Sequence, residues 1–413
     1  MEYGCIGEKL THSFSREIHH RIAPYSYELC ELEPAELGSF LRMRAFRAVN
    51  VTIPYKQAVI PYLDEISEQA KKIGAVNTIV NRGGRLYGYN TDFYGLSALL
   101  NRIGIRPAEG KTLVLGTGGT SKTACAVLRS MGAKRLIRVS RTEGEETVTY
   151  AEAYRKHGDA AFVINTTPCG MYPKADCQPL QLCRFPSLRG VADAIYNPLR
   201  TALVSEALRY GIRAEGGLYM LVAQAVAASE LFTGTKFPSD PSEEVYRSLL
   251  SEKENLVLTG MPGCGKTTVG KLLASRLLRP FLDLDHMIEE RAGMTVSEIF
   301  RRSGEEGFRE LEEQVIREDA APRTGCVIAT GGGAVLRDTN VAYLKQNGKI
   351  VWIDRPPEAL VPTPDRPLAL SREEILKRYA ERHDRYLQTC DTAVSAGESA
   401  EETADRIMEV MNK

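Results

Sequence analysis

The chain has 413 residues, 43% of them hydrophobic and 26% charged, which predicts two or three ordinary globular domains. Its formal net charge is zero and its pI is near 7, which argues against a general nucleic-acid or membrane-surface binder. The nine cysteines follow no C-x-x-C pattern, so we expect reduced thiols. The N-terminus lacks a basic region followed by an apolar core, and the most apolar stretch, 218–232, is too short to cross a bilayer. These features predict a soluble cytoplasmic protein.

Short apolar strands alternate with helical patterns along the chain, which predicts an α/β architecture. The first part, residues 1–97, is expected to form strands at 3–6, 48–53 and 76–80 and helices at 34–42 and 64–73. A buried strand at 111–115, a glycine loop, a helix at 122–131 and a second strand at 135–139 come next. This βαβ order predicts a Rossmann-like nucleotide-binding domain over residues 98–216.

An alanine-rich helix is expected over residues 217–232, followed by a loop rich in Gly, Pro and Ser. Asp240 is a candidate N-cap for one more helix, with Pro241 at its first position and its end near residue 250. The helices within 217–250 are expected to complete the first domain. Polar residues 251–255 then predict a short linker, and residues 256–413 contain a complete strand–helix series of their own.

The first glycine loop, GTGGTS, begins at Gly116 and partly matches the dinucleotide-binding fingerprint, although Ser121 stands at its third glycine position. Taken alone, this loop could be an ordinary tight turn between a strand and a helix. The next strand ends in residues 140–142, Ser-Arg-Thr, with no acidic residue to bind a ribose 2′-hydroxyl. A guanidinium beside two hydroxyls suits a 2′-phosphate, so NADP is favoured over NAD. The alternative for Arg141 is an ordinary solvated arginine.

Polar residues also gather at the ends of several predicted strands, and each of them alone could be a turn or surface residue. Together with the glycine loop they form eight motifs in a fixed order: HSFS (12–15), NVTIPYK (50–56), GAVNT (74–78), YNTD (89–92), GTGGTS (116–121), NTTPCGM (165–171), DAIYNPLRT (193–201) and GLYMLVAQA (217–225). In this order and spacing, residues 1–250 resemble the shikimate dehydrogenase family.

This resemblance implies a catalytic pair, Lys56 and Asp92, in the cleft between two domains. A hydride that moves to a ring ketone leaves an alkoxide, and a lysine held by a carboxylate can supply its proton. The implied substrate contacts are Ser13, Ser15, Thr52, Lys56, Asn77, Asp92, Tyr196 and Gln224. The implied NADP contacts are Gly116, Gly118, Gly119, Thr120, Ser140, Arg141, Thr142 and Gly217.

The second glycine loop, GMPGCGKTT at 260–268, follows an apolar strand at 256–258 and precedes a helical pattern at 269–278. This context predicts a P-loop, in which backbone N–H groups bind phosphates, a lysine reaches the β- and γ-phosphates and a threonine holds Mg²⁺. A glycine turn with an unrelated Lys-Thr pair is the alternative, which the flanking strand and helix disfavour. The expected ATP contacts here are Gly260, Gly263, Cys264, Gly265, Lys266, Thr267 and Thr268.

Further polar residues follow the P-loop. Asp283 and Asp285 are expected either on one face of a strand, where they could serve Mg²⁺ and a substrate hydroxyl, or as a helix-capping pair. Arg309 and Glu312 lie one helical turn apart, and an arginine there suits a carboxylate. The remaining candidates are the glycines at 331–333, Arg366 in a proline-rich loop, and Arg382 and Tyr386 on a late helix.

These motifs resemble shikimate kinase over essentially all of residues 256–400. The resemblance implies that Asp285 orients or deprotonates the 3-hydroxyl of shikimate, and that Lys266 and Arg366 stabilise the γ-phosphoryl group. Mg²⁺ would be held by Thr267 and Asp283. The implied shikimate contacts are Asp285, Arg309, Gly332, Gly333 and Arg382. The segment before Arg366 is shorter than is usual in the family, and it has no arginine between Arg355 and Arg366.

The two resemblances predict a bifunctional enzyme of the shikimate pathway in three α/β parts: a substrate domain, a Rossmann-like NADP domain, and a P-loop domain with a parallel sheet like that of nucleoside monophosphate kinases. The first half would reduce 3-dehydroshikimate with NADPH, and the second would phosphorylate shikimate with ATP and Mg²⁺. The alternatives are a preference for quinate or NAD, a kinase for another polyol acid, and a nucleotide-sensing second half without turnover. Its partners would be small molecules, neither nucleic acid nor membrane, and its oligomeric state is left open.

Overall fold

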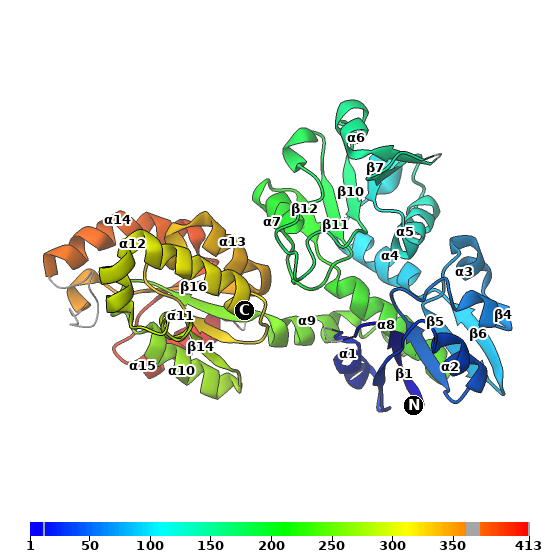
Figure 1. Cartoon of the computed structure of the whole chain (residues 1–413), viewed down its shortest axis with the longest axis horizontal. Coiled ribbons are helices and arrows are strands. Elements are labelled where there is room, and N and C mark those ends of the chain that lie inside the picture. Colours follow the sequence, from blue (N-terminus) through cyan, green and yellow to red (C-terminus); the bar gives the residue numbers. More distant parts are fainter. Residues whose placement is uncertain (11–12, 145, 361–371, 412–413) are drawn as a thin grey trace. The chain divides into compact units, whose positions relative to one another are not determined.

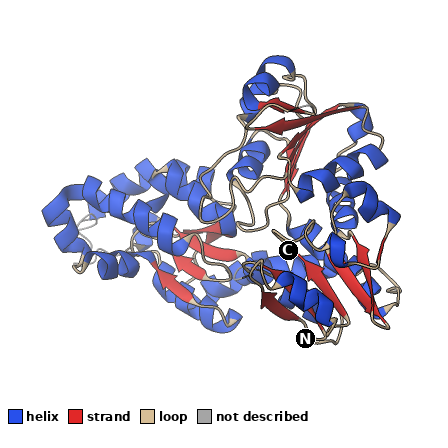
Figure 2. Cartoon of the chain, turned by 45° about the vertical axis from the view of Figure 1, so that its right-hand side comes forward, coloured by secondary structure: helices blue, strands red, loops and turns tan. Residues whose placement is uncertain are grey.

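The computed structural model describes residues 1–10, 13–144, 146–360 and 372–411, and it divides into two compact units, 1–250 and 251–413 (Figure 1). Helices and strands alternate through both units (Figure 2), so the predicted α/β class is confirmed. No helix in the described part combines the length and the apolar character needed to cross a membrane.

The first sheet of unit 1 has six strands in the order β2-β1-β3-β5-β6-β4. They are β1 (Tyr3–Gly7), β2 (Glu28–Glu31), β3 (Ala48–Val51), β4 (Glu65–Ile66), β5 (Thr78–Arg82) and β6 (Arg85–Tyr89), with helices α1 (Ser15–Ile22), α2 (Leu37–Met43) and α3 (Glu68–Ile73). β1 pairs in parallel with β2 and β3, whereas β3, β5 and β6 pair antiparallel. The helix expected at 64–73 is shorter than predicted, because Ser67 caps it by accepting a hydrogen bond from the backbone N–H of Ala70 at 3.2 Å.

The second sheet of unit 1 has six parallel strands in the order β12-β11-β10-β7-β8-β9. They are β7 (Lys111–Leu115), β8 (Arg135–Ser140), β9 (Thr147–Thr149), β10 (Phe162–Asn165), β11 (Gly190–Asp193) and β12 (Arg213–Glu215). The helices that follow β6 in this unit are α4 (Asp92–Arg102), α5 (Gly119–Ser130), α6 (Tyr150–Lys156), α7 (Ala202–Arg209), α8 (Leu218–Thr233) and α9 (Ser242–Lys253), the last three residues of which belong to unit 2. Separate apolar clusters, built around Val114 and Leu113, lie on the two faces of the sheet, as expected for a Rossmann-like domain.

The segment predicted as a linker is largely regular structure. Asp240 accepts a hydrogen bond from the backbone N–H of Ser242 at 2.8 Å, so the predicted start of the helix agrees with the structure. α9 then continues to Lys253 instead of ending near residue 250, and the next strand already begins at Asn255. Helix-compatible residues at 251–253 explain the longer helix.

Unit 2 contains a five-stranded parallel sheet in the order β14-β15-β13-β16-β17. The strands are β13 (Asn255–Thr259), β14 (Phe281–Asp283), β15 (Val327–Ala329), β16 (Gly348–Asp354) and β17 (Thr392–Ser395). Its helices are α10 (Lys266–Leu277), α11 (Leu284–Ala292), α12 (Val296–Val315), α13 (Asp338–Asn347), α14 (Arg372–Thr389) and α15 (Ala400–Met411). β13 is the middle strand, so the glycine loop that follows it lies at the carboxyl edge of the sheet, where α/β proteins bind ligands.

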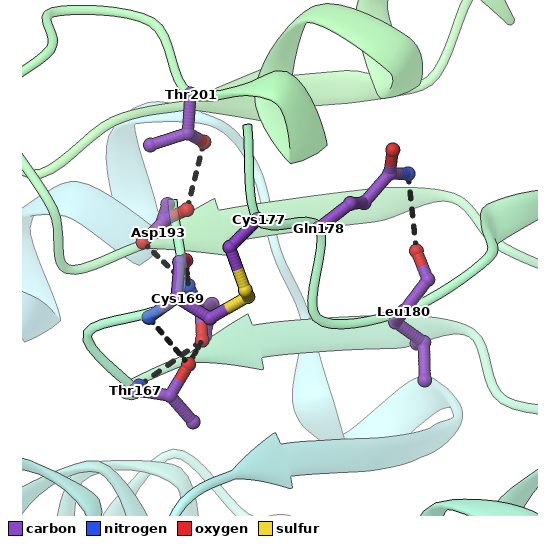
Figure 3. Close-up of a disulfide and its surroundings, with 8 residues drawn as sticks. Thr167, Cys169, Cys177, Gln178, Leu180, Asp193 and Thr201 are labelled. Atoms are coloured by element: carbon purple, nitrogen blue, oxygen red, sulfur yellow. Dashed lines mark hydrogen bonds between the residues drawn. A yellow bond between two sulfur atoms is a disulfide. The ribbon is translucent and has the colours of Figure 1, made fainter. Parts of the chain in front are cut away.

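One pair of cysteines contradicts the expectation of reduced thiols. Cys169 and Cys177 form a disulfide (Figure 3), while the other seven cysteines are free. Backbone hydrogen bonds from Met171 to Pro168, from Lys174 to Met171 and from Cys177 to Lys174 turn the chain back on itself. The expectation was wrong for this pair because the turn, and no recognisable cysteine spacing, brings the two residues together.

Two candidate active sites

The first candidate site is built around Lys56 and Asp92. Lys56 lies in the turn after β3, and Asp92 is the first residue of α4. Lys56 Nζ lies 2.6 Å from Asp92 Oδ2, and the two side chains are only 16% and 9% exposed. A charged pair this deeply buried needs further hydrogen bonds, and Asp92 Oδ1 accepts one from Asn77 Nδ2 at 2.9 Å. The arrangement can hold a lysine ready to exchange a proton with a bound ligand.

Hydrogen bonds connect this pair to a residue far along the chain. Asn77 Nδ2 lies 3.5 Å from Gln224 Oε1, which also accepts a hydrogen bond from Thr91 Oγ1 at 3.2 Å. Gln224 belongs to α8, and α8 packs against α4. Four predicted site residues, Lys56, Asn77, Asp92 and Gln224, therefore gather in one buried polar cluster.

The other predicted substrate contacts lie on neighbouring segments. Ser13 Oγ donates to Ser15 Oγ at 3.0 Å at the start of α1. Between them, the ring of Phe14 packs against that of Tyr196 at a centroid distance of 5.5 Å. Burial raises the pKa of Tyr196 to about 12, so its hydroxyl stays protonated. Thr52 follows β3, and its backbone N–H donates to Ile6. The substrate roles of Ser13, Ser15, Thr52 and Tyr196 stay predictions.

A cleft of about 1330 Å³ lies beside the Lys56–Asp92 pair. Its lining includes seven predicted NADP contacts: Gly116, Gly118, Gly119, Thr120, Ser140, Arg141 and Thr142. A Cβ atom placed on Gly118 would meet no atom within 4 Å, so there is room for a ligand directly before the N-terminus of α5. Gly217 is outside this lining; its backbone N–H donates to Ile195 at 2.7 Å.

Lys56 connects the cleft to the polar cluster. It also lines the cleft, and its Cβ and Cδ atoms lie 3.9 Å from the position that a Cβ would take on Gly119. The ammonium that contacts Asp92 thus belongs to a side chain that runs along the glycine loop. A nucleotide in the cleft and a small polar molecule at the cluster would both be within reach of this residue.

Sequence reasoning did not assign several other residues that line the cleft. They include Tyr150 and residues of the loop that follows β10 and contains the disulfide: Thr166, Thr167, Cys169, Met171, Tyr172 and Cys177. The motif NTTPCGM was the available signal, but no ligand contact was predicted from it.

Buried hydrogen bonds hold this loop in place (Figure 3). Asp193 Oδ1 accepts from Asn165 Nδ2 at 3.0 Å, and Asp193 Oδ2 accepts from Thr201 Oγ1 at 2.8 Å. Asn165 Oδ1 in turn accepts from the backbone N–H of Thr167 at 3.0 Å. Burial raises the pKa of Asp193 to about 6, whereas the three hydrogen bonds to its carboxylate oppose that rise. The loop is therefore fixed at its start by Asn165 and closed by the disulfide.

The second candidate site begins at the P-loop between β13 and α10. Gly265 precedes α10 with φ +104°, a conformation that favours glycine. Lys266 is buried, and its Nζ donates to the carbonyl oxygens of Gly260 at 2.8 Å and Met261 at 3.0 Å. The ammonium therefore lies within the curve of the loop, where phosphate oxygens could replace the carbonyl groups as its partners.

The two aspartates after α10 occupy different elements. β14 ends at Asp283, and Asp285 lies in the first turn of α11. Asp283 Oδ1 accepts the backbone N–H of Asp285 at 3.1 Å, so the helix-capping interpretation is correct and the arrangement on one strand face is wrong. The chain turns into a helix at Leu284, which ends the alternation of side chains. Thr267 Oγ1 donates to Asp283 Oδ2 at 2.8 Å, and oxygen ligands of this kind suit Mg²⁺.

The three glycines at 331–333 bring the second site together. A Cβ on Gly331 would lie 2.9 Å from both Asp285 Oδ1 and Glu312 Oε1, and one on Gly333 would collide with the Arg309 guanidinium. Arg382 Nη1 donates to the carbonyl oxygen of Gly332 at 3.1 Å. All five predicted shikimate contacts therefore meet around this segment, because glycine allows close approach.

Arg309 and Glu312 form a buried ion pair on α12, with Nη1 and Oε2 2.7 Å apart. Glu312 is fully buried, and its Oε1 has no hydrogen-bond partner among the described residues. Burial raises the pKa of Glu312, while Arg309 lowers it. The sequence shows that Arg309 and Glu312 lie one helical turn apart, but Glu312 was not predicted as a site residue. The predicted contact Arg366 lies outside the described residues.

Comparisons with known proteins find relatives of both parts of the chain. Residues 5–79 match the family model "Shikimate dehydrogenase substrate binding domain", and residues 262–412 match "Shikimate kinase". The chain is 39% identical over 261 residues to the shikimate dehydrogenase (NADP(+)) of Clostridium beijerinckii, an alignment that covers 59% of this chain and 96% of that protein.

Solved structures agree with the relationship of the first part. Shikimate dehydrogenase 1 from Peptoclostridium difficile is 33% identical with a TM-score of 0.56, covering 60% of this chain and 98% of that one. Shikimate 5-dehydrogenase from Thermus thermophilus, solved in complex with NADP(H) and shikimate, is 32% identical with a TM-score of 0.54, covering 60% and 99%. The chain therefore belongs to the shikimate dehydrogenase family, and its second unit carries a shikimate kinase domain.

Proposed function

We propose that the chain catalyses two successive reactions: NADPH-dependent reduction of 3-dehydroshikimate to shikimate, and ATP-dependent phosphorylation of shikimate to shikimate 3-phosphate. The observation that carries the first reaction is the position of Lys56, whose stem runs along the glycine loop and whose ammonium contacts Asp92. The convergence of Asp285, Arg309 and the P-loop around 331–333 supports the second.

In the reduction, NADPH when bound supplies the hydride that adds to the carbonyl carbon. Lys56 donates a proton to the carbonyl oxygen, which becomes the new hydroxyl group. Asp92 holds the lysine ammonium in place, and Asn77 orients Asp92 through its other oxygen. Lys56 then regains a proton from solvent. Ser13, Ser15, Thr52, Tyr196 and Gln224 are proposed to bind the hydroxyl and carboxylate groups of the substrate.

In the phosphorylation, Asp285 accepts the proton of the shikimate 3-hydroxyl. The 3-oxygen of shikimate attacks the γ-phosphorus of ATP at the same time, and ADP leaves. Lys266 leaves the loop carbonyls to neutralise the transferred phosphoryl group, with Arg366 as a second proposed cation. Mg²⁺, when bound by Thr267 and Asp283, would neutralise further phosphate charge. Arg309 and Arg382 are proposed to bind the shikimate carboxylate by charged hydrogen bonds.

We assign each reaction to one unit. Residues 1–97 with the helices in 217–250 bind the dehydrogenase substrate, residues 98–216 bind NADP(H), and residues 256–413 form the kinase. Arg141 lines the cleft between Ser140 and Thr142, which supports NADP over NAD because a guanidinium pairs with the 2′-phosphate.

The experiment measures each reaction separately with the purified chain. NADPH oxidation should require 3-dehydroshikimate. Turnover should be slower when NADH replaces NADPH, and slower when 3-dehydroquinate, the precursor of quinate, replaces 3-dehydroshikimate. ADP formation should require both shikimate and Mg²⁺. Nucleotide binding without shikimate-dependent ADP formation would contradict the kinase proposal, and faster turnover with NADH or with 3-dehydroquinate would contradict the proposed cofactor or substrate.

A further inference from the structure

A line of buried polar side chains extends from the Lys56–Asp92 pair to Tyr27, which directly precedes β2. The line passes through Asn50 on β3 and Thr78 on β5, and neither these two residues nor Tyr27 has a role in the proposed reaction. Tyr27, Asn50 and Thr78 are all buried, with Tyr27 1% exposed. Buried polar groups of this kind need defined partners, so the direction of each hydrogen bond matters.

The hydrogen bonds of Asn50 determine which way its amide faces. Asn50 Nδ2 lies 3.4 Å from the backbone carbonyl oxygen of Asn77, which can only accept. The NH₂ group must therefore face Asn77 and Thr78, and Asn50 Oδ1 faces Tyr27. Tyr27 Oη donates to that oxygen at 2.7 Å. Burial raises the pKa of Tyr27 well above its usual value, so the donated proton is present at every physiological pH.

The same reasoning continues to the catalytic pair. Thr78 Oγ1 accepts from Asn50 Nδ2 at 3.2 Å, so its own hydrogen can be donated to Asn77 Oδ1 at 3.1 Å or to Thr91 Oγ1 at 3.0 Å. Thr91 Oγ1 itself lies 3.2 Å from Asn77 Oδ1, so both routes lead to the same amide oxygen. Asn77 Oδ1 also accepts the backbone N–H of Thr91 at 2.6 Å. With its oxygen engaged in this way, Asn77 must present its NH₂ group to Asp92 Oδ1.

We infer that Tyr27 is a positioning residue for the Lys56–Asp92 pair, and that it acts through Asn50, Thr78 and Asn77. This inference rests on the proposed dehydrogenase function. Without the tyrosine hydroxyl, Asn50 Oδ1 loses the donor that lies 2.7 Å from it. The Asn50 side chain, no longer fixed at its oxygen, then donates less firmly to Thr78 Oγ1, and Thr78 is a less well-oriented donor to Asn77. Asn77 then holds Asp92 less firmly, and Lys56 with it.

The ring of Tyr27 is held independently of its hydroxyl. It stacks on His19 with centroids 3.9 Å apart and an interplanar angle of 8°. Tyr27→Phe therefore removes the hydroxyl and keeps the stacked ring. Tyr25→Phe is a matched control, because the Tyr25 hydroxyl bonds His19 Nδ1 at 2.6 Å and, in the part of the chain that the structure describes, has no hydrogen bond to Asn50, Thr78 or Asn77.

The experiment compares the two variants with the wild-type chain. Tyr27→Phe should lower kcat for 3-dehydroshikimate roughly three- to tenfold, a smaller loss than general-acid removal causes, and should change KM less than kcat. The alkaline limb of its pH–rate profile should move to lower pH, and the Lys56 ¹³Cε resonance of lysine-labelled protein should shift. Tyr25→Phe should match the wild type in all four measurements, and the kinase rate of every variant reports correct folding of unit 2.

A second pair of variants tests the route. Thr78→Val should reproduce the Tyr27→Phe effects, whereas Thr78→Ser, which keeps the hydroxyl, should give near wild-type values. The double variant Tyr27→Phe/Thr78→Val should lose no more activity than Thr78→Val alone. Wild-type kcat, pH profile and Lys56 resonance in Tyr27→Phe, or additive losses in the double variant, would overturn the inference. A wild-type chain that does not oxidise NADPH with 3-dehydroshikimate would instead refute the proposed function, and the inference with it.

Discussion

Lys56 Nζ lies 2.6 Å from Asp92 Oδ2, although 36 positions separate the two residues in the chain. The lysine comes from the turn after β3 and the aspartate from the first turn of α4. Because the same lysine borders the glycine loop, this one pair defines where a ketone would have to lie to receive both a hydride and a proton.

Lys56→Ala should lower the dehydrogenase rate roughly 10²- to 10⁴-fold, the usual contribution of a positioned general acid, and leave the kinase rate unchanged. Asp92→Asn should give a smaller loss, because the amide still occupies the site but no longer balances the lysine charge. Stopped-flow or steady-state NADPH oxidation measures both. Loss of the kinase rate as well, in a folded Lys56→Ala chain, would contradict the assignment of separate sites.

Lys266→Ala should have the opposite effect. Removing the buried ammonium takes away a charged donor for the transferred phosphoryl group and should slow shikimate-dependent ADP formation roughly 10²- to 10³-fold. NADPH oxidation should stay at the wild-type rate. Lys271→Ala, on the same helix but beyond its first turn, is the control, and it should retain both activities. An equal loss in both variants would rule out a specific role for Lys266.

Breaking the Arg309–Glu312 pair should lower the free energy of unfolding of unit 2, an effect that can be measured separately from kinase activity. Arg309→Ala leaves the fully buried Glu312 carboxylate without its cation, which should destabilise unit 2 by ~3–5 kcal/mol. Adding Glu312→Gln should recover part of that stability without recovering kinase activity. Trp352 is the single tryptophan of the chain and is buried in unit 2, so its fluorescence during urea unfolding reports this unit. Equal stability of the single and double variants would contradict the explanation.

Because of the disulfide, we expect the KM for NADPH to depend on whether a reductant is present. Cys169 and Cys177 close a loop that lines the cleft, so reduction should loosen the loop and raise KM for NADPH by roughly a fewfold through lost preorganisation. Cys169→Ser should resemble the reduced wild type, and Cys183→Ser, which changes an exposed free thiol, should not. Thiol titration of the unfolded chain should find seven thiols before reduction and nine after. Nine thiols before reduction would refute the disulfide.

His19 predicts how the stability of unit 1 depends on pH. Burial lowers the pKa of His19 from 6.5 to about 3, so the folded chain resists protonation that the unfolded chain accepts. The stability from this difference is fully present above pH 6.5 and is lost progressively as the pH falls toward 3, by an amount on the order of a few kcal/mol. His19→Phe should flatten this dependence, whereas His20→Gln, at an exposed neighbour, should keep it. Hydrogen exchange of α1 and β3 between about pH 4 and 7 measures this pH dependence of stability. If stability changed with pH by the same slope in the wild type and in His19→Phe, the explanation would be contradicted.

The sequence predicted the parts of both sites that depend on local spacing. A P-loop requires its glycines, Lys266 and Thr267 within a few residues, and the dinucleotide loop likewise keeps Gly116 and Gly118 close to a strand end. Six strands, β1, β3, β5, β7, β8 and β13, were predicted to within two residues at each end, because buried strands are continuous apolar runs. Most other strands were not predicted; β2 and β4, for example, have only four and two residues, too few for a periodic pattern.

Features that depend on contacts between distant segments could not be predicted. Nothing in the spacing of Cys169 and Cys177 indicates the turn that joins them. The change from strand to helix at Leu284 separated two aspartates that a longer strand would have kept on one face. The connection of Tyr27 to Asp92 passes through two strands, β3 and β5, to the start of α4, and it depends on which way the buried amides of Asn50 and Asn77 face.

The most direct test of the central claim is a single reaction that contains the purified chain, 3-dehydroshikimate, NADPH, ATP and Mg²⁺, analysed by mass spectrometry for products. We predict shikimate 3-phosphate from the wild-type chain, unreacted 3-dehydroshikimate with Lys56→Ala, and accumulated shikimate with Lys266→Ala. An equal mixture of the two variants should restore shikimate 3-phosphate. Accumulation of shikimate in the wild-type reaction, or no consumption of 3-dehydroshikimate, would contradict a chain that carries out both steps.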